Sequence, residues 1–240
     1  MRRVNVKVER ILIKFTKNNG AKFISHLDTV RTLHRAFRRA ELPISYSKGF
    51  NPHASISVAS PLSLGIESNA EYADVEINEA IDINIIVKAL NEVLPNDIKI
   101  EKVVIINGKM PASMAVVDSA RYSIRFDKEA SEEICSKLIN EILGQEEIMK
   151  IKKSKAGEKL INIRPFIKDL SYEKFDNEHI KFDCILQTGS NGSLGADKLA
   201  TIIKEYSQGE IYGHPYIIRE EIYTLINDKR IALDCYFAGM

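Results

Sequence analysis

Hydrophobic and polar residues alternate in the first part of the chain in a pattern that predicts strands and helices in turn. Ile11, Ile13 and Phe15 lie at every second position, as in a strand with one buried face. The predicted elements of this part are a strand at 10–17, a helix at 26–40, strands at 54–59 and 71–78, a helix at 83–94 and a strand at 98–106. This order is typical of the ferredoxin-like βαββαβ arrangement.

A second series of elements follows residues 107–113, a segment without periodicity that we interpret as a linker. The series contains a strand at 121–126, a helix at 129–143, a hairpin of 149–153 with 159–163, a strand at 179–186, a helix at 194–206 and strands at 217–225 and 230–237. The sequence therefore predicts an α+β protein of two tandem ferredoxin-like halves with antiparallel sheets, at residues 1–107 and 117–240. The second half carries a Gly-rich loop and a C-terminal hairpin.

Composition is that of an ordinary globular protein, with 45% hydrophobic residues in 240. No apolar run approaches the roughly 18 residues that a membrane span needs, and the N-terminal MRRVNVKVER lacks the apolar core of a signal peptide. We therefore expect a cytoplasmic protein without a membrane partner. Cys135, Cys184 and Cys235 are far apart and odd in number, which predicts buried free thiols rather than disulfides or metal ligands.

Positive charge is concentrated at the start of the chain, although the net charge is only +1. Residues 1–60 contain 12 Lys and Arg against 3 Asp and Glu, whereas residues 61–120 contain 4 against 10. A local field that attracts anions is therefore expected in the first quarter of the protein.

The helix predicted at 26–40 holds most of this charge. Ser25 and Asp28 have the spacing of an N-cap and its partner. An apolar stripe is predicted from Leu27, Val30, Leu33, His34, Phe37 and Ala40, which gives His34 a structural role. The opposite face carries Arg31, Arg35, Arg38 and Arg39. No acid follows Asp28 until Glu41, so these arginines favour a phosphate-binding surface, with a merely solvated face as the alternative.

The loop after this helix combines polar groups and aromatic rings between Gly and Pro residues. Tyr46, Lys48, Phe50 and Asn51 are predicted to bind phosphate or stack bases, and the alternatives are a simple connecting turn or a ring that fills a groove. His53 is the best candidate for a general acid or base, because imidazole titrates near neutral pH. The other catalytic candidates are His26, Ser47 and Lys48.

The sequence contains two further candidate sites. His26 and His53 with Asp28 or Glu71 could form a metal site, but they lack the spacing of metal ligands, and we expect neither a metal nor a cofactor. A secondary anion site could use Gly192, Ser193 and Arg164, with ordinary N-capping by Ser193 as the alternative.

Several familiar catalytic motifs do not occur in the sequence. It lacks the three-cysteine CxxxCxxC motif, so the chain cannot itself ligate a radical SAM cluster. It also lacks the P-loop, GxGxxG, HExxH and GxSxG patterns of nucleotide-binding proteins, zinc proteases and serine hydrolases.

Four motifs resemble those of the radical-SAM-linked protein family, a domain of unknown function. They are FISHLDTVR (23–31), RRAELPISYSKGFNPH (38–53), PLSLGIES (61–68) and EYAD (71–74), with weaker similarity in KLINIRP (159–165) and GSNGSL (189–194). This family occurs free-standing or fused behind a cobalamin-binding radical SAM protein, often encoded near ribosomal-protein and ribonuclease genes. The resemblance implies a companion role in RNA or ribosome biology and supplies no reaction.

Three functions follow from these observations. The first is a non-catalytic accessory protein that binds RNA, or presents a substrate, for a separately encoded radical SAM enzyme. The second is a protein-interaction module that docks on that enzyme without RNA. The third is a metal-independent RNA-processing enzyme that uses His53 or His26 with Ser47 and Lys48.

Overall fold

The computed structural model describes residues 8–128, 132–154, 157–174, 176 and 179–239. The chain forms two compact units, one of Met1–Val117 with Glu221–Met240 and one of Asp118–Glu220. The predicted bounds differ from this division at the C-terminus, because the last 20 residues group with the first unit rather than with the second. In the described part of the chain, no helix is both long and apolar enough to cross a bilayer.

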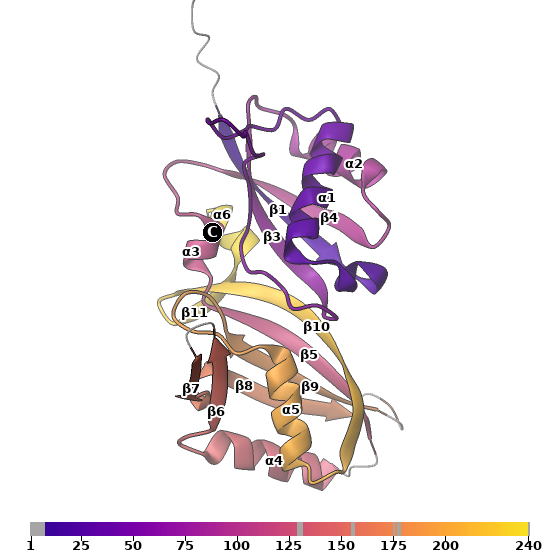
Figure 1. The fold of residues 1–240 in the computed structure, drawn as a ribbon, viewed down its shortest axis with the longest axis vertical. Helices are drawn as coiled ribbons and strands as arrows, with labels where there is room; N and C mark the ends of the chain where they lie inside the picture. The colour runs from indigo at the N-terminus through magenta and orange to yellow at the C-terminus, as the bar shows by residue number, and fades with distance from the viewer. Residues whose placement is uncertain (1–7, 129–131, 155–156, 175, 177–178, 240) are drawn as a thin grey trace, which may run out of the picture. The chain divides into compact units, whose positions relative to one another are not determined.

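The first unit is a sheet with two helices on one face (Figure 1). Its elements are β1 (Glu9–Lys17), the 3-10 helix η1 (Asn19–Phe23), α1 (His26–Arg39), β2 (Ile56–Val58), β3 (Glu67–Ile77), α2 (Ile83–Val93), β4 (Ile98–Ile106), α3 (Ser113–Val116), β11 (Lys229–Ala232) and α6 (Leu233–Phe237). β1 pairs antiparallel with both β3 and β4, and the short β2 pairs antiparallel with β3.

The core of the first unit lies between the sheet and the helices α1 and α2. Ile11, Ile13 and Phe15 point from β1 into this core, as their alternation predicts. Buried residues from the helices that complete it are Leu33, Ala36, Phe37, Ile86 and Leu90. The helix α1 is therefore held on the sheet by one face, which leaves its other face for solvent or a ligand.

The second unit also combines strands with helices. Its elements are β5 (Ser119–Lys128), α4 (Glu132–Gly144), β6 (Met149–Ser154), β7 (Gly157–Asn162), η2 (Arg164–Phe166), β8 (Ile167–Lys174), β9 (His179–Gln187), α5 (Ala196–Tyr206) and the part of β10 (Ile211–Ile226) up to Glu220. β9 pairs antiparallel with β5 and with β8, and β6 pairs with β7 as the predicted hairpin.

Most predicted elements are present, and several differ in their bounds or type. The strand predicted at 54–59 is reduced to β2. β8 was not predicted, because the register shift between Ile167 and Asp169 breaks the two-residue alternation. The strand predicted at 230–237 ends at Ala232, after which Leu233 and Phe237, four residues apart and both buried, belong to α6.

The structure is thus an α+β protein in which every strand pair of determined register is antiparallel. The predicted C-terminal hairpin is formed by β10 and β11. It turns at Asn227 and Asp228, and both residues have the positive φ that such a two-residue turn requires.

Candidate nucleic-acid interface

The helix α1 begins at the N-cap that the sequence predicts. Ser25 Oγ accepts a hydrogen bond from the Asp28 backbone N–H (3.1 Å) and donates one to Asp28 Oδ2 (2.7 Å). Hydrogen bonds from Ser25 and then from Arg31 hold the pKa of Asp28 below its usual value. The first turn of α1 is therefore fixed, with a carboxylate at the positive end of the helix.

The buried face of α1 is rotated from the predicted stripe. Thr29, Leu33, Ala36 and Phe37 are buried, whereas Leu27 is 62% exposed. Thr29 can be buried because its hydroxyl donates to the Ser25 carbonyl oxygen (3.0 Å), a satisfied polar group that a count of apolar residues misses.

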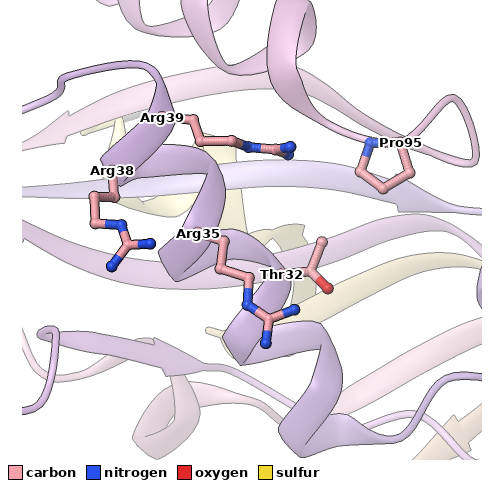
Figure 2. A pocket seen from close by; sticks show the side chains of 5 residues that line it. All are labelled: Thr32, Arg35, Arg38, Arg39 and Pro95. Carbon is pink, nitrogen blue, oxygen red and sulfur yellow. The ribbon is translucent and has the colours of Figure 1, made fainter.

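Three of the predicted arginines line one hollow on the exposed side of α1. Arg35, Arg38 and Arg39 surround a space of about 270 Å³ together with Thr32 and Pro95. Figure 2 shows Arg39 extending toward Pro95, Arg35 beside Thr32, and Arg38 projecting away from Pro95. The hollow therefore presents several guanidinium groups to one region of solvent.

The charge of this surface is only partly neutralised within the first unit. Arg31 pairs with Asp28 at 3.0 Å on the solvent-exposed surface, where such a pair contributes little. Arg39 donates a hydrogen bond to the Val93 carbonyl oxygen, which is an acceptor without formal charge. In the described parts of the chain, Arg35 and Arg38 form no ion pair within 4.0 Å. The acidic residues of 61–120 thus do not cancel this part of the basic surface.

The loop from Tyr46 to His53 is exposed throughout. Its base is closed by hydrogen bonds from the Ser47 N–H to the His53 carbonyl oxygen (2.8 Å) and from the His53 N–H to Ser47 Oγ (2.9 Å). Tyr46 and Ala54 also form an isolated β-bridge. Phe50 is fully exposed, with a relative exposure of 109%, so it fills no groove within its own unit. The loop is therefore a closed projection that carries Lys48, Phe50 and Asn51.

A side-chain contact connects this loop to α1. His34 Nε2 lies 3.0 Å from the Tyr46 hydroxyl, and the two rings meet edge to face with centroids 5.7 Å apart. His34 therefore has the structural role that the sequence predicts, in fixing the start of the loop against the helix rather than in the apolar core. The start of the loop is therefore attached to the helix that carries the arginines.

A second hollow, of about 420 Å³, contains two of the catalytic candidates. Ser47 and His53 line it with Ser55, Ser57 and Glu76, and further lining comes from Arg10, Ala54, Ile56, Asp74 and Ala112. His26 and Lys48 are not among its lining residues. The structure therefore brings together half of the catalytic candidates.

The charges of this second hollow are largely used within the fold. Arg10 pairs with Asp74 at 3.0 Å and donates to the carbonyl oxygens of Met110 and Pro111. The other oxygen of Asp74 accepts from the Ser113 N–H (2.8 Å) and hydroxyl (2.6 Å). The imidazole of His53 thus faces a hollow whose main charged pair holds the 107–113 segment in place.

The metal site considered above is not assembled. Among the described residues, no group of three or more His, Cys, Asp or Glu side chains is arranged to hold a metal ion. His26, at the start of α1, and His53, in the loop, do not come together with Asp28 or Glu71 in such a group.

The secondary anion site is also not formed by its three candidates. Arg164 donates to the Leu143 carbonyl oxygen (2.7 and 3.2 Å) and to that of Ile167 (3.0 Å), so its guanidinium is occupied within the second unit. The cap of α5 is Gly195, without a side-chain hydrogen bond, so Ser193 is not the N-cap. Gly192 packs against Phe166, where an added Cβ would lie 2.8 Å from the ring.

A polar cluster on the reverse face of the first sheet was not predicted. The Tyr72 hydroxyl lies 2.7 Å from Glu221 Oε1 and 3.1 Å from Asp234 Oδ1. Lys14 pairs with Glu221 (2.6 Å) and Lys102 with Asp234 (2.8 Å). Lys14 gives the only indication of this cluster in the sequence, because it alternates with the core residues of β1. Its partner Glu221 lies more than 200 positions away along the chain.

The cysteines agree with the prediction of free thiols, although only two of them are buried. Cys135 and Cys184 are buried and Cys235 is half-buried, and none forms a disulfide. Burial raises the pKa of the Cys184 thiol, which keeps it protonated and unreactive.

Comparison with known proteins gives a family and a distant structural similarity. No curated protein sequence matches the chain. One similar solved structure is "Crystal Structure of a Cbf5-Nop10-Gar1 Complex", with 10% sequence identity and a TM-score of 0.49. The match covers 88% of this chain and 48% of that chain, so this chain spans about half the length of the solved one. The pattern of a family described as "Uncharacterized protein conserved in bacteria (DUF2344)" matches residues 10–195, and the chain therefore belongs to this family.

Proposed function

We propose that this protein is a non-catalytic accessory protein that binds RNA through the first unit. The observation that carries the proposal is the hollow lined by Arg35, Arg38 and Arg39, on the helix whose His34 contacts an exposed loop with two aromatic rings. Clustered guanidinium groups with few acidic partners bind phosphate oxygens well, since each offers several donors in a fixed plane. Exposed aromatic rings next to such a surface favour nucleic acid over isolated anions.

The partner in this proposal is a separately encoded radical SAM enzyme, for which the protein would hold or present the RNA substrate. This part of the proposal rests on the resemblance of the 23–53 and 61–74 motifs to the radical-SAM-linked family. The chain has no cysteine motif for the iron–sulfur cluster, so the chemistry would belong to the partner.

Arginine substitution tests the RNA-binding proposal. Arg35→Ala and Arg39→Ala are expected to weaken binding of a labelled random-sequence RNA pool at low salt, whereas Lys88→Ala, an exposed residue of α2, should leave the affinity unchanged. Fluorescence anisotropy titration measures the dissociation constants. Equal affinities for all four proteins would contradict the proposal.

A second candidate function is docking on the radical SAM enzyme without RNA. It is favoured by three exposed apolar side chains near the start of α1, Phe23, Leu27 and Leu64. A hydrogen bond from the Gly65 N–H to the Lys22 carbonyl oxygen (2.9 Å) brings the Leu64 segment next to Phe23. Co-purification of the two proteins that survives nuclease treatment and depends on Leu27, but not on Arg35, would favour this candidate.

The RNA-processing enzyme has its own supporting observation, the shared hollow of Ser47 and His53. It needs no separate partner, so incubation of the protein alone with labelled RNA tests it directly. Turnover by the wild type that His53→Ala abolishes would favour the enzyme over the accessory role.

The finer fold is also a proposal: we propose that each unit is ferredoxin-like. In the first unit β1 lies between β3 and β4, with β2 on β3, as that fold requires. In the second, the strand order β10-β5-β9-β8 repeats this arrangement once the β6–β7 hairpin is treated as an insertion. An experimental structure of the whole chain would test both topologies.

A further inference from the structure

We infer that the interface on the first unit takes single-stranded rather than double-stranded RNA. In this inference an unpaired base stacks on Phe50 while the neighbouring phosphates lie on the Arg35 and Arg38 side of α1. It rests on the proposed RNA-binding function and specifies the class of RNA that the site recognises.

The Phe50 ring is placed where only an external group can cover it. Its relative exposure is 109%, and the hydrogen bonds between Ser47 and His53 fix the loop below it. A single exposed apolar residue is ordinary on a protein surface. This one is distinguished by its position, in a loop of eight consecutive exposed residues that also carries Lys48 and Asn51.

Tyr46 adds a second ring at the α1 end of the same loop. It is 45% exposed, and its hydroxyl is held by His34, so its orientation is set by the helix that carries the arginines. Both rings therefore belong to residues that follow the arginine-bearing helix closely in the sequence. Aromatic platforms combined with a positive surface are the usual means of binding single strands without strict sequence preference.

Duplex RNA cannot use these rings. Its base faces are covered by their neighbours in the stack, and its deep, narrow major groove excludes side chains. Duplex binding depends on phosphate and 2′-hydroxyl contacts, to which a phenyl ring contributes no hydrogen bond. The arginines alone would bind both forms, so the selectivity is expected to come from Phe50.

The test compares one RNA in two states. An unstructured labelled RNA of about 12 nucleotides, within the range of single-strand site sizes, is titrated alone and as a duplex with its complement. The wild type should bind the single strand about tenfold more tightly than the duplex. Phe50→Ala should lose about tenfold in affinity for the single strand and nothing for the duplex, as expected for one lost base stack.

Two controls accompany this test. Phe23→Ala removes another exposed phenyl group of the first unit, outside the loop, and should change neither affinity. Phe50→Tyr keeps a stacking face and should retain the wild-type selectivity. Thermal unfolding should be unchanged in Phe50→Ala, because the side chain is fully exposed.

Three outcomes would overturn the inference. If the wild type bound the single strand and the duplex with equal affinity, the inference would be refuted while RNA binding stayed intact. The same holds if Phe50→Ala lowered both affinities by the same factor. Absence of binding to either RNA would refute the proposed function and this inference with it.

Discussion

At the scale of single residues, the polar cluster around Tyr72 shows how charge is accommodated on the reverse face of the first sheet. Tyr72 is completely buried, and its one hydroxyl hydrogen faces the carboxylates of Glu221 and Asp234. Burial, and then these two carboxylates, raise the pKa of Tyr72, so it stays neutral. Lys14 and Lys102 supply the compensating positive charges, so the cluster is electrically balanced and is best understood as structural.

Asp234 makes this cluster sensitive to acid. Burial alone would raise its pKa, but the hydrogen bond from Lys102, the charges of Lys14 and Lys102, and the Tyr72 hydroxyl together hold it below the usual value of 3.8. A carboxyl whose pKa is lowered on folding contributes stability above its unfolded pKa and loses that contribution as the pH falls through the folded value. The contribution is therefore complete near neutral pH and is lost below about pH 4.

Asp234→Asn is accordingly expected to lower the free energy of unfolding by about 1–3 kcal/mol near neutral pH, because Lys102 loses its charged partner. The difference from the wild type should shrink as the pH falls below about 4, where the wild-type carboxyl becomes protonated. Urea unfolding followed by circular dichroism over this pH range measures it. Asp228→Asn, in the exposed hairpin turn, is the control, and a pH-independent difference for Asp234→Asn would contradict the assignment.

At the scale of elements, the helix α1 begins at the predicted residue and ends one residue before the predicted end, but its buried face differs from the predicted one. Its cap at Ser25 depends only on neighbours in the sequence, so local reasoning finds it. The buried face depends on how α1 meets the sheet, which no local pattern specifies. The same holds for β8, where a bulge interrupts the alternation, and for α6, whose four-residue spacing of Leu233 and Phe237 is too short to identify a helix.

The loop before α5 illustrates a glycine that serves packing rather than anion binding. Gly192 has a φ of 115° and approaches Phe166 of η2 so closely that an added Cβ would lie 2.8 Å from the ring. Gly209 has a similar φ of 98° but no atom within 4 Å of an added Cβ. An alanine at either position would therefore be strained by the positive φ, and only at position 192 would it also meet the Phe166 ring.

Gly192→Ala should consequently be less stable than Gly209→Ala by about 1–3 kcal/mol, the usual cost of overpacking. Both variants are measured by urea unfolding in the same buffer. If both lose the same free energy, the contact with Phe166 has no energetic weight, and the glycine is needed for its backbone alone.

At the scale of the whole molecule, the candidate interface lies within one stretch of the sequence, whereas the polar contacts of the fold join distant residues. The arginines and the loop lie within 30 residues of each other, so one stretch is enough to propose an interface, and the structure adds the His34–Tyr46 contact between helix and loop. Contacts such as Arg10 with Asp74, or Lys14 with Glu221, join residues that are 64 and 207 positions apart. They arise from strand pairing and chain return, and the return of Glu221–Met240 to the first unit was for this reason not foreseen.

The near-neutral net charge of the chain gives no sign of the local positive surface on which the RNA-binding proposal depends. A net charge of +1 gives no general attraction to nucleic acid, so RNA affinity needs a local concentration of positive charge, which the proposal places on α1. Binding should therefore depend on a few identified guanidinium groups rather than on the protein as a whole.

The dependence of RNA affinity on salt tests this claim most directly. Each phosphate contact on a single strand contributes about 0.7 to the slope of log affinity against log salt concentration. The double variant Arg35→Ala/Arg38→Ala is predicted to bind more weakly than the wild type and to reduce the magnitude of this slope by about 1.4, twice that contribution, while Lys88→Ala leaves it unchanged. An unchanged slope in the double variant would show that these arginines do not contact phosphate and would contradict the account.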